Sequence, residues 1–170
     1  PHWNESAYES CDMLMAISQQ TYNINKNVCV RKPRIEGKDL TYVQHGIDET
    51  IFKTIPKDDP SLLEFKKKLF GDKEYEYIAL FNSRNIIRKH PADLISAFNS
   101  FVLTLPKDVR DNTALILHTD IVDNAGTDLK AVAHRLAGDS NVIFSAGKLE
   151  PIQLNYLYNI ADVMCNPSSA

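Results

Sequence analysis

The stretch that decides the fold spans residues 77–91 and reads Tyr-Ile-Ala-Leu-Phe-Asn-Ser-Arg-Asn-Ile-Ile-Arg-Lys-His-Pro. Its first five residues, 77–81, form a continuous apolar run, which is typical of a strand buried on both faces of a parallel sheet. Its last residue, Pro91, suits the first turn of a helix, because that position needs no backbone N–H. The stretch therefore predicts a strand, a loop over residues 82–90 and a helix.

The same order of strand and helix recurs towards the C-terminus. Short apolar runs predict three further strands, at residues 114–119, 142–145 and 162–165. Helices are expected between them, beginning at Pro91, after Thr127 as the N-cap, and at Pro151. Pro106 with the Asp-Asn pair at 111–112 indicates a turn before the second strand. This alternation predicts an α/β fold with a Rossmann-like, doubly wound parallel sheet.

The chain before this region is less regular. Asp59 and Pro60 predict the start of a helix that ends at Gly71. Strands are expected at residues 12–17 and 40–43, and the polar, basic residues 26–40 between them suggest a loop or hairpin. We expect this first part to belong to a neighbouring unit or to a connection.

Composition limits the classes of function. The 170 residues are 44% hydrophobic and 24% charged, which is typical of a globular protein. The net charge of −3 argues against a nucleic-acid grip based on overall charge. No apolar run approaches the ~20 residues that cross a bilayer. The three cysteines and five histidines show no zinc-ligand spacing, so we expect reduced thiols, no metal cofactor and a cytoplasmic location.

The loop at residues 82–90 is the first candidate binding site. Ligands of open parallel sheets bind outside the carboxyl ends of the strands, where this loop is expected. It carries Arg84, Arg88 and Lys89 without an acidic residue and leads into the helix at Pro91. Cations next to a helix N-terminus suit a phosphate or diphosphate. The loop has no glycine-rich phosphate motif, so a solvated basic loop is an equally good interpretation of these residues alone.

Several stretches together resemble the retaining glycosyltransferases of family 4, which have the GT-B fold. The His-Gly-Ile-Asp turn within residues 43–52 resembles the start of that family's donor domain, and Arg84 and Lys89 match the spacing of its Gly-Arg-x4-Lys-Gly loop. Ser83 and His90 stand where the family usually has glycines. The remaining similar stretches lie at residues 12–18, 142–149, 154–163 and 166–169.

The resemblance implies specific roles for residues in two loops. Arg84 and Lys89 would bind the diphosphate of a nucleotide-diphosphate-sugar donor, and Ser83 would place its backbone amide near the phosphates. A second group would lie beside the nucleotide base, largely through backbone contacts: Gly147, Lys148 and Leu149. No metal is implied, and no catalytic residue is assigned.

The resemblance also implies a division of the chain and an activity. Residues 1–40 would be the end of the acceptor-side domain with the crossover, and residues 41–170 a truncated donor domain. The intact protein would be a hexosyltransferase-type glycosyltransferase of glycan biosynthesis that acts with retention of configuration. The family's Glu-x7-Glu stretch would follow Ser169, so this part is expected to be inactive alone.

Partners and rival functions follow from the same interpretation. The expected partners are a nucleotide-sugar donor and a glycan, lipid or small-molecule acceptor, with no nucleic acid; peripheral membrane association of the intact protein stays open. Two other functions also stay open. One is a different nucleotide-binding Rossmann-like enzyme, and the other is a non-catalytic nucleotide-binding or scaffold module.

Overall fold

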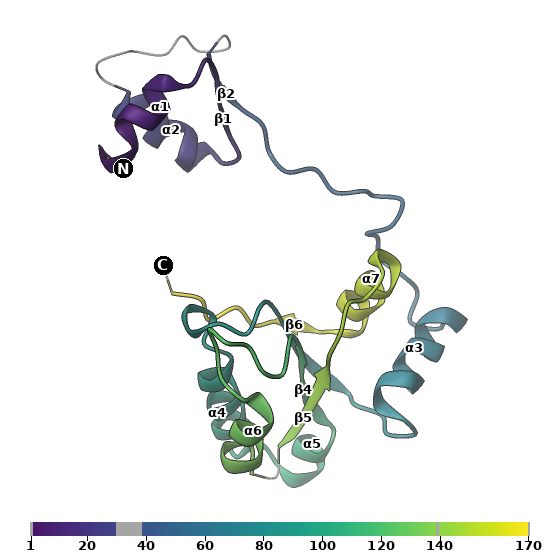
Figure 1. Ribbon diagram of the computed structural model, residues 1–170. Coiled ribbons are helices and arrows are strands. Elements are labelled where there is room, and N and C mark those ends of the chain that lie inside the picture. Colours follow the sequence, from purple (N-terminus) through teal and green to yellow (C-terminus); the bar gives the residue numbers. More distant parts are fainter. Residues whose placement is uncertain (1, 30–38, 139, 170) are drawn as a thin grey trace. The chain divides into compact units, whose positions relative to one another are not determined.

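The computed structural model describes residues 2–29, 39–138 and 140–169 (Figure 1). The chain divides into two compact units, with the junction between Asp48 and Glu49. The boundary expected at residues 40 and 41 therefore lies inside the first unit. That the units are parts of an acceptor-side and a donor domain stays a prediction.

The first unit contains a small parallel sheet. Strand β1 (Leu14–Ala16) pairs with β2 (Leu40–Tyr42), so the strands expected in these places are confirmed, in shorter form. Helix α2 (Gln19–Val28) begins after Ser18, whose hydroxyl accepts a hydrogen bond from the amide of Thr21 at 3.1 Å. The end of α2 occupies the start of the expected basic loop, and residues 30–38 of that loop lie outside the described residues.

Two short helices precede this sheet and were not predicted from the sequence. They are η1 (His2–Asn4) and α1 (Glu5–Ser10). The unit has its own small core, in which Ala16, Tyr22 and Leu40 are buried.

The second unit contains a four-stranded parallel sheet. Its strands are β3 (Tyr77–Asn82), β4 (Thr113–His118), β5 (Asn141–Ser145) and β6 (Val163–Met164). Their order across the sheet is β5-β4-β3-β6, and all neighbours are parallel. The chain therefore moves outward from β3 to β5 and returns to the other side of β3. The order reverses between β3 and β6, as in doubly wound folds, and the α/β prediction is confirmed.

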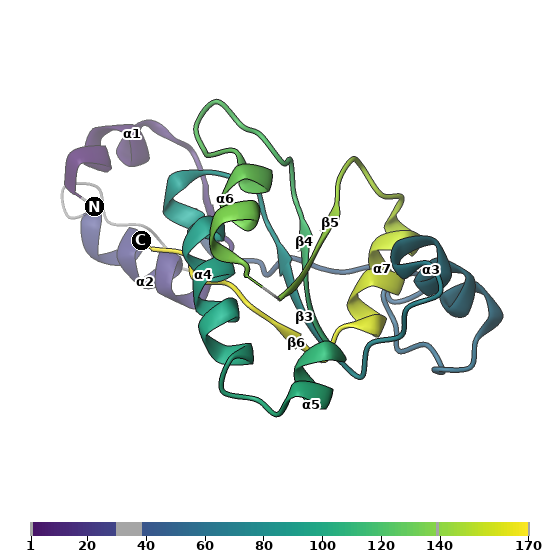
Figure 2. The same cartoon turned by 90° about the horizontal axis from the view of Figure 1, so that it is seen from below.

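Helices cover both faces of this sheet (Figure 2). On one face lie α4 (Pro91–Val102) and α6 (Leu129–Leu136); on the other lie α3 (Pro60–Phe70) and α7 (Pro151–Ile160). The starts expected at Pro60, Pro91 and Pro151 are confirmed. The segment expected to turn before β4 contains the short helix α5 (Lys107–Asp111).

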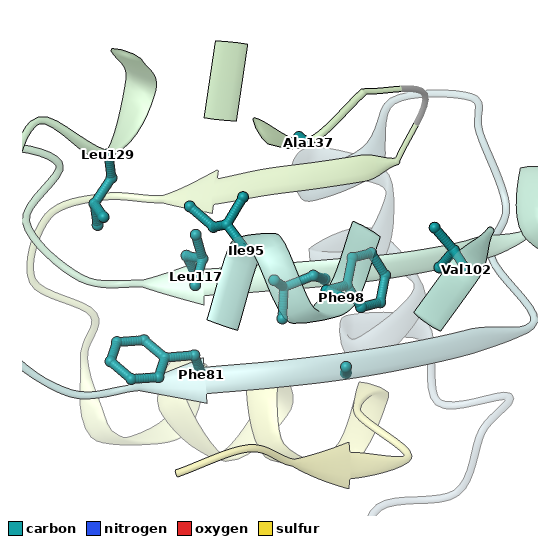
Figure 3. Packing of buried hydrophobic residues seen from close by; sticks show 9 residues of the cluster. Phe81, Ile95, Phe98, Val102, Leu117, Leu129 and Ala137 are labelled. Carbon is teal, nitrogen blue, oxygen red and sulfur yellow. The ribbon is translucent and has the colours of Figure 1, made fainter. Parts of the chain in front are cut away.

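Strand β3 shows why both faces must be apolar. Phe81 points to the side of α4 and packs with Ile95 and Phe98, as Figure 3 shows. Ile78 and Leu80 belong to the opposite cluster, which includes residues of α3 and α7. Alternate residues of a strand face opposite sides of a sheet, so a strand covered twice must be apolar throughout.

One predicted cap was wrong. The N-cap of α6 is Asp128 and not Thr127, because the Asp128 carboxylate accepts hydrogen bonds from the amides of Lys130 and Ala131 at 3.0 and 3.1 Å. Thr127 instead uses its backbone carbonyl, which accepts a hydrogen bond from the side chain of Asn85 at 2.7 Å. Sequence reasoning could not distinguish two adjacent residues that are both good caps.

Replacing Asp128 by Ala should lower the free energy of unfolding by about 1 kcal/mol, because two amides of the first turn lose their acceptor. Thr127→Ala is the matched control and should change the free energy by less than about 0.5 kcal/mol. Urea denaturation followed by circular dichroism measures both variants. A larger loss for Thr127→Ala would contradict the assignment of the cap.

Candidate functional site

A hollow of about 310 Å³ lies at the carboxyl ends of three neighbouring strands. We call it the carboxyl-end hollow. It is lined by residues that end or follow β3, β4 and β5: Asn82, Ser83, Arg84, His118, Thr119, Asp120, Gly147 and Lys148. Four of the residues predicted from the sequence, from two loops more than sixty positions apart, therefore surround one space. Ligands bind in this position in open parallel sheets.

Arg84 is held by a carboxylate from the next loop. Its Nε donates to Asp123 Oδ2 at 2.7 Å, and its Nη2 donates to Asp123 Oδ1 at 3.2 Å. The Asp123 side chain is 8% exposed, whereas that of Arg84 is 65% exposed. The hydrogen bond from Arg84 holds the pKa of Asp123 below its usual range, and the same bond raises the pKa of Arg84. Both groups are therefore charged at neutral pH.

Asn85 joins the loop after β3 to the loop after β4. Its side chain is fully buried, and its amide nitrogen donates to the carbonyls of Ile121 at 3.2 Å and Thr127 at 2.7 Å. Gly126 packs so closely that a Cβ there would lie 2.1 Å from the carbonyl oxygen of Asn85. The loops after β3 and β4 therefore pack against each other next to Arg84.

Another wall of the hollow is built by His118 at the end of β4. Its Nδ1 lies 2.8 Å from the carbonyl oxygen of Ser145, and a carbonyl only accepts, so Nδ1 carries the hydrogen. This fixes the ring and leaves Nε2 for a ligand. The neighbouring Thr119 is buried, and its hydroxyl has no hydrogen-bond partner among the described residues.

His90 connects the loop to the segment after β6, where the strand order reverses. Its Nδ1 lies 2.9 Å from Asp93 Oδ2, and its Nε2 lies 3.2 Å from the hydroxyl of Ser169. Its φ of 52° is left-handed, a conformation that favours glycine. This backbone angle explains why a glycine suits the position of His90 in the family that the sequence resembles. Ser83 has no such backbone angle.

The remaining predicted residues lie elsewhere. Lys89 ends the 3-10 helix η2 (Ile87–Lys89), and Leu149 packs against the core cluster beneath α3 and α7. Neither is among the described residues that line the hollow. His45, which begins the His-Gly-Ile-Asp turn, is exposed in the first unit. The roles given to all of these residues stay predictions.

Asp123 and Asn85 were missed by sequence reasoning. Asp123 lies 39 positions from Arg84, and no spacing rule connects them. Asn85 sits in a loop whose cations are its most evident feature in the sequence. A polar residue between Arg84 and Ile86 gives no sign that its side chain is buried. Only the positions of β3 and β4 as neighbours could have suggested that their loops meet.

Further features of the described residues concern metal-binding clusters, membrane-spanning helices and other hollows. Within residues 2–29, 39–138 and 140–169, no cluster of three His, Cys, Asp or Glu side chains could hold a metal ion. No helix in the same ranges is long and apolar enough to span a bilayer. A second hollow of about 310 Å³ lies next to α3 and the residues that follow it, within residues 63–74, and it shares no lining residue with the carboxyl-end hollow.

The chain was compared with known proteins. No protein-family model and no curated protein matches it, but solved structures do. A glycosyltransferase from Rickettsia africae ESF-5 superposes with a TM-score of 0.70 at 16% identity, over 99% of this chain and 42% of the other. WaaG, a glycosyltransferase involved in lipopolysaccharide biosynthesis, gives 0.60 at 23% identity, over 91% and 38%. This chain has the fold of one domain of the GT-B glycosyltransferases.

A third match is to a structure that contains a bound ligand. A trehalose-6-phosphate structure from E. coli bound with UDP-2-fluoro glucose superposes with a TM-score of 0.55 at 14% identity, over 90% of this chain and 39% of the other. The chain thus spans about two fifths of the length of the structures that it matches. At these identities the likeness establishes the GT-B fold, and the chemistry must be argued from the residues of the site.

Replacing Asn85 by Ala should lower the free energy of unfolding by about 2 kcal/mol, because buried carbonyls lose their donor. Asn124→Ala is the matched control, since Asn124 is exposed in the loop that Asn85 holds, and it should have little effect. Denaturant unfolding of both variants checks this. Equal stabilities would contradict the proposed connection between the loops.

Proposed function

We propose that the carboxyl-end hollow binds the diphosphate of a nucleotide-diphosphate-sugar donor. In the intact protein, the sugar would then be transferred to an acceptor with retention of configuration. The observation that carries this proposal is the convergence of Arg84 and Lys148 on one hollow at the carboxyl ends of β3 and β5. A GT-B fold in a glycosyltransferase-like chain supports the same conclusion.

The charges of the hollow suit a leaving group that becomes more negative. When a sugar leaves a nucleoside diphosphate, negative charge grows on the β-phosphate. Cations placed beforehand stabilise this charge most strongly in the transition state. Arg84 offers a planar group of donors and Lys148 a mobile point charge. Lys89, which ends η2 in the same loop, is the second cation that we propose for the phosphates.

The other end of the donor would lie along the loop after β5. Gly147 has a φ of 88° and open space around its Cα, so its backbone can approach a flat base closely. Leu149, which is expected beside the base, would also support this loop, because it packs partly against the core cluster. The match to a structure bound with UDP-2-fluoro glucose supports a nucleotide-sugar as the class of donor.

The wider assignments belong to the same proposal. The second unit would be the larger part of a donor domain, and the first unit the end of an acceptor-side domain. The intact protein would work in the cytoplasm, without a metal, as a hexosyltransferase of glycan biosynthesis. Its acceptor would be a glycan, a lipid or a small molecule, and a lipid acceptor would place it at a membrane surface.

Isothermal titration calorimetry with UDP, GDP and ADP tests the donor site. At least one nucleotide should bind the protein, and Arg84→Ala should weaken its binding at least tenfold, because a charge-assisted contact to phosphate is lost. Arg135→Ala is the matched control, since Arg135 is an exposed arginine at the end of α6, and it should leave the Kd unchanged. No binding of any of the three nucleotides would refute the proposal.

A further inference from the structure

We propose that Asp123 is a positioning residue that holds Arg84 in the orientation in which it binds the donor diphosphate. This inference rests on the proposed function. It assigns a role to a residue outside the predicted set, and it gives the acidic loop after β4 a part in anion binding. Asp123 acts through Arg84 and does not contact the donor itself.

The geometry of the pair leaves part of the guanidinium group unused. A guanidinium carries five N–H donors. The Asp123 carboxylate takes two of them, one on Nε and one on Nη2. Three donors remain, two on Nη1 and one on Nη2, and none has a partner among the described residues. Nη1 and Nη2 form the end of the group, which binds two phosphate oxygens in the manner of a fork.

The carboxylate of Asp123 is firmly placed. Its Oδ1 also accepts a hydrogen bond from the amide of Ala125 at 2.8 Å, within a loop that the buried Asn85 holds in place. Arg84, in contrast, extends from the surface by a long chain and is mostly exposed. An arginine that is immobilised before the ligand arrives loses less conformational entropy on binding. Asp123 therefore supplies this order in the free protein.

Competition between Asp123 and a phosphate is the opposite interpretation, and the position of the carboxylate argues against it. Arg84 lines the carboxyl-end hollow, whereas Asp123 is not among its described lining residues. An anion in the hollow would therefore approach the guanidinium group from the side that faces away from the Asp123 carboxylate. The acidic residue that does line the hollow is Asp120, whose charge also raises the pKa of Arg84 without any hydrogen bond to it.

The test compares Asp123→Asn with Asp120→Asn by calorimetry, with the nucleotide that binds best and with inorganic pyrophosphate as ligands. Each variant removes one negative charge near the hollow. By charge alone, both should bind an anion more tightly. An asparagine oxygen can still accept from the amide of Ala125, but the amide group cannot accept both hydrogen bonds from Arg84. Asp123→Asn should therefore weaken binding about tenfold, while Asp120→Asn, which only removes a charge that repels the anion, should make binding tighter.

A double variant separates this role from a general effect on structure. In an Arg84→Ala background, the further change Asp123→Asn should alter the Kd by less than about twofold, because the residue through which Asp123 acts is gone. Tighter or unchanged binding by Asp123→Asn overturns the inference, and so does the same tenfold loss in the Arg84→Ala background. Failure of the unaltered protein to bind any of these ligands refutes the proposed function as well.

Arg84→Lys tests the same interaction by changing the arginine in place of the carboxylate. Lysine keeps the positive charge, but all its N–H donors lie on a single nitrogen, so it cannot contact both carboxylate oxygens with a planar edge and also present a planar fork to a phosphate. Arg84→Lys should weaken binding about as much as Asp123→Asn does. The unfolding midpoint of Asp123→Asn without ligand is measured as well, to check that this variant folds. An unchanged Kd for Arg84→Lys would show that charge alone is sufficient and would overturn the inference, even if Asp123→Asn failed to fold.

Discussion

The site depends on the hydrogen bonds that the buried side chain of Asn85 donates. This side chain donates to two carbonyls of the loop after β4 while its own loop follows β3, so loops from adjacent strands are fixed together. Gly126 allows the contact because any side chain at that position would overlap the backbone of Asn85. The Asp123–Arg84 pair connects the same two loops. The hydrogen bonds of Asn85 fix these loops relative to each other and so hold the pair in place.

The electrostatics of the hollow arise from neighbouring loops and not from the charge of the whole chain. The chain is acidic overall, yet Arg84 and Lys148 reach the same space from strands on either side of β4. Asp120 and Asp123 lie in the loop between them and limit the local excess of positive charge. With such a balance, binding of the proposed diphosphate depends on oriented donors as well as on net attraction.

Regular elements were predictable because their signals are local. Pro60, Pro91 and Pro151 each begin a helix as expected, and the apolar runs became strands, of which β3 and β4 are buried on both faces. The basic loop with Arg84 was a candidate from its charge and its place after a strand, whereas Ser83, Gly147 and Lys148 followed from the resemblance to family 4. These four residues line one hollow, and their roles in binding stay predictions. The partners of these residues were not predictable, because the pairing of Arg84 with Asp123 and the burial of Asn85 arise only from three-dimensional packing.

Mapping of backbone amide shifts by NMR on addition of UDP, GDP or ADP tests the central claim most directly. The account predicts that the largest changes fall in the loops after β3 and β5, at Ser83, Arg84, Gly147 and Lys148. Smaller changes should follow at Asp123 through Arg84. Changes centred on the second hollow beside α3, or no changes with any of the three nucleotides, would contradict the account.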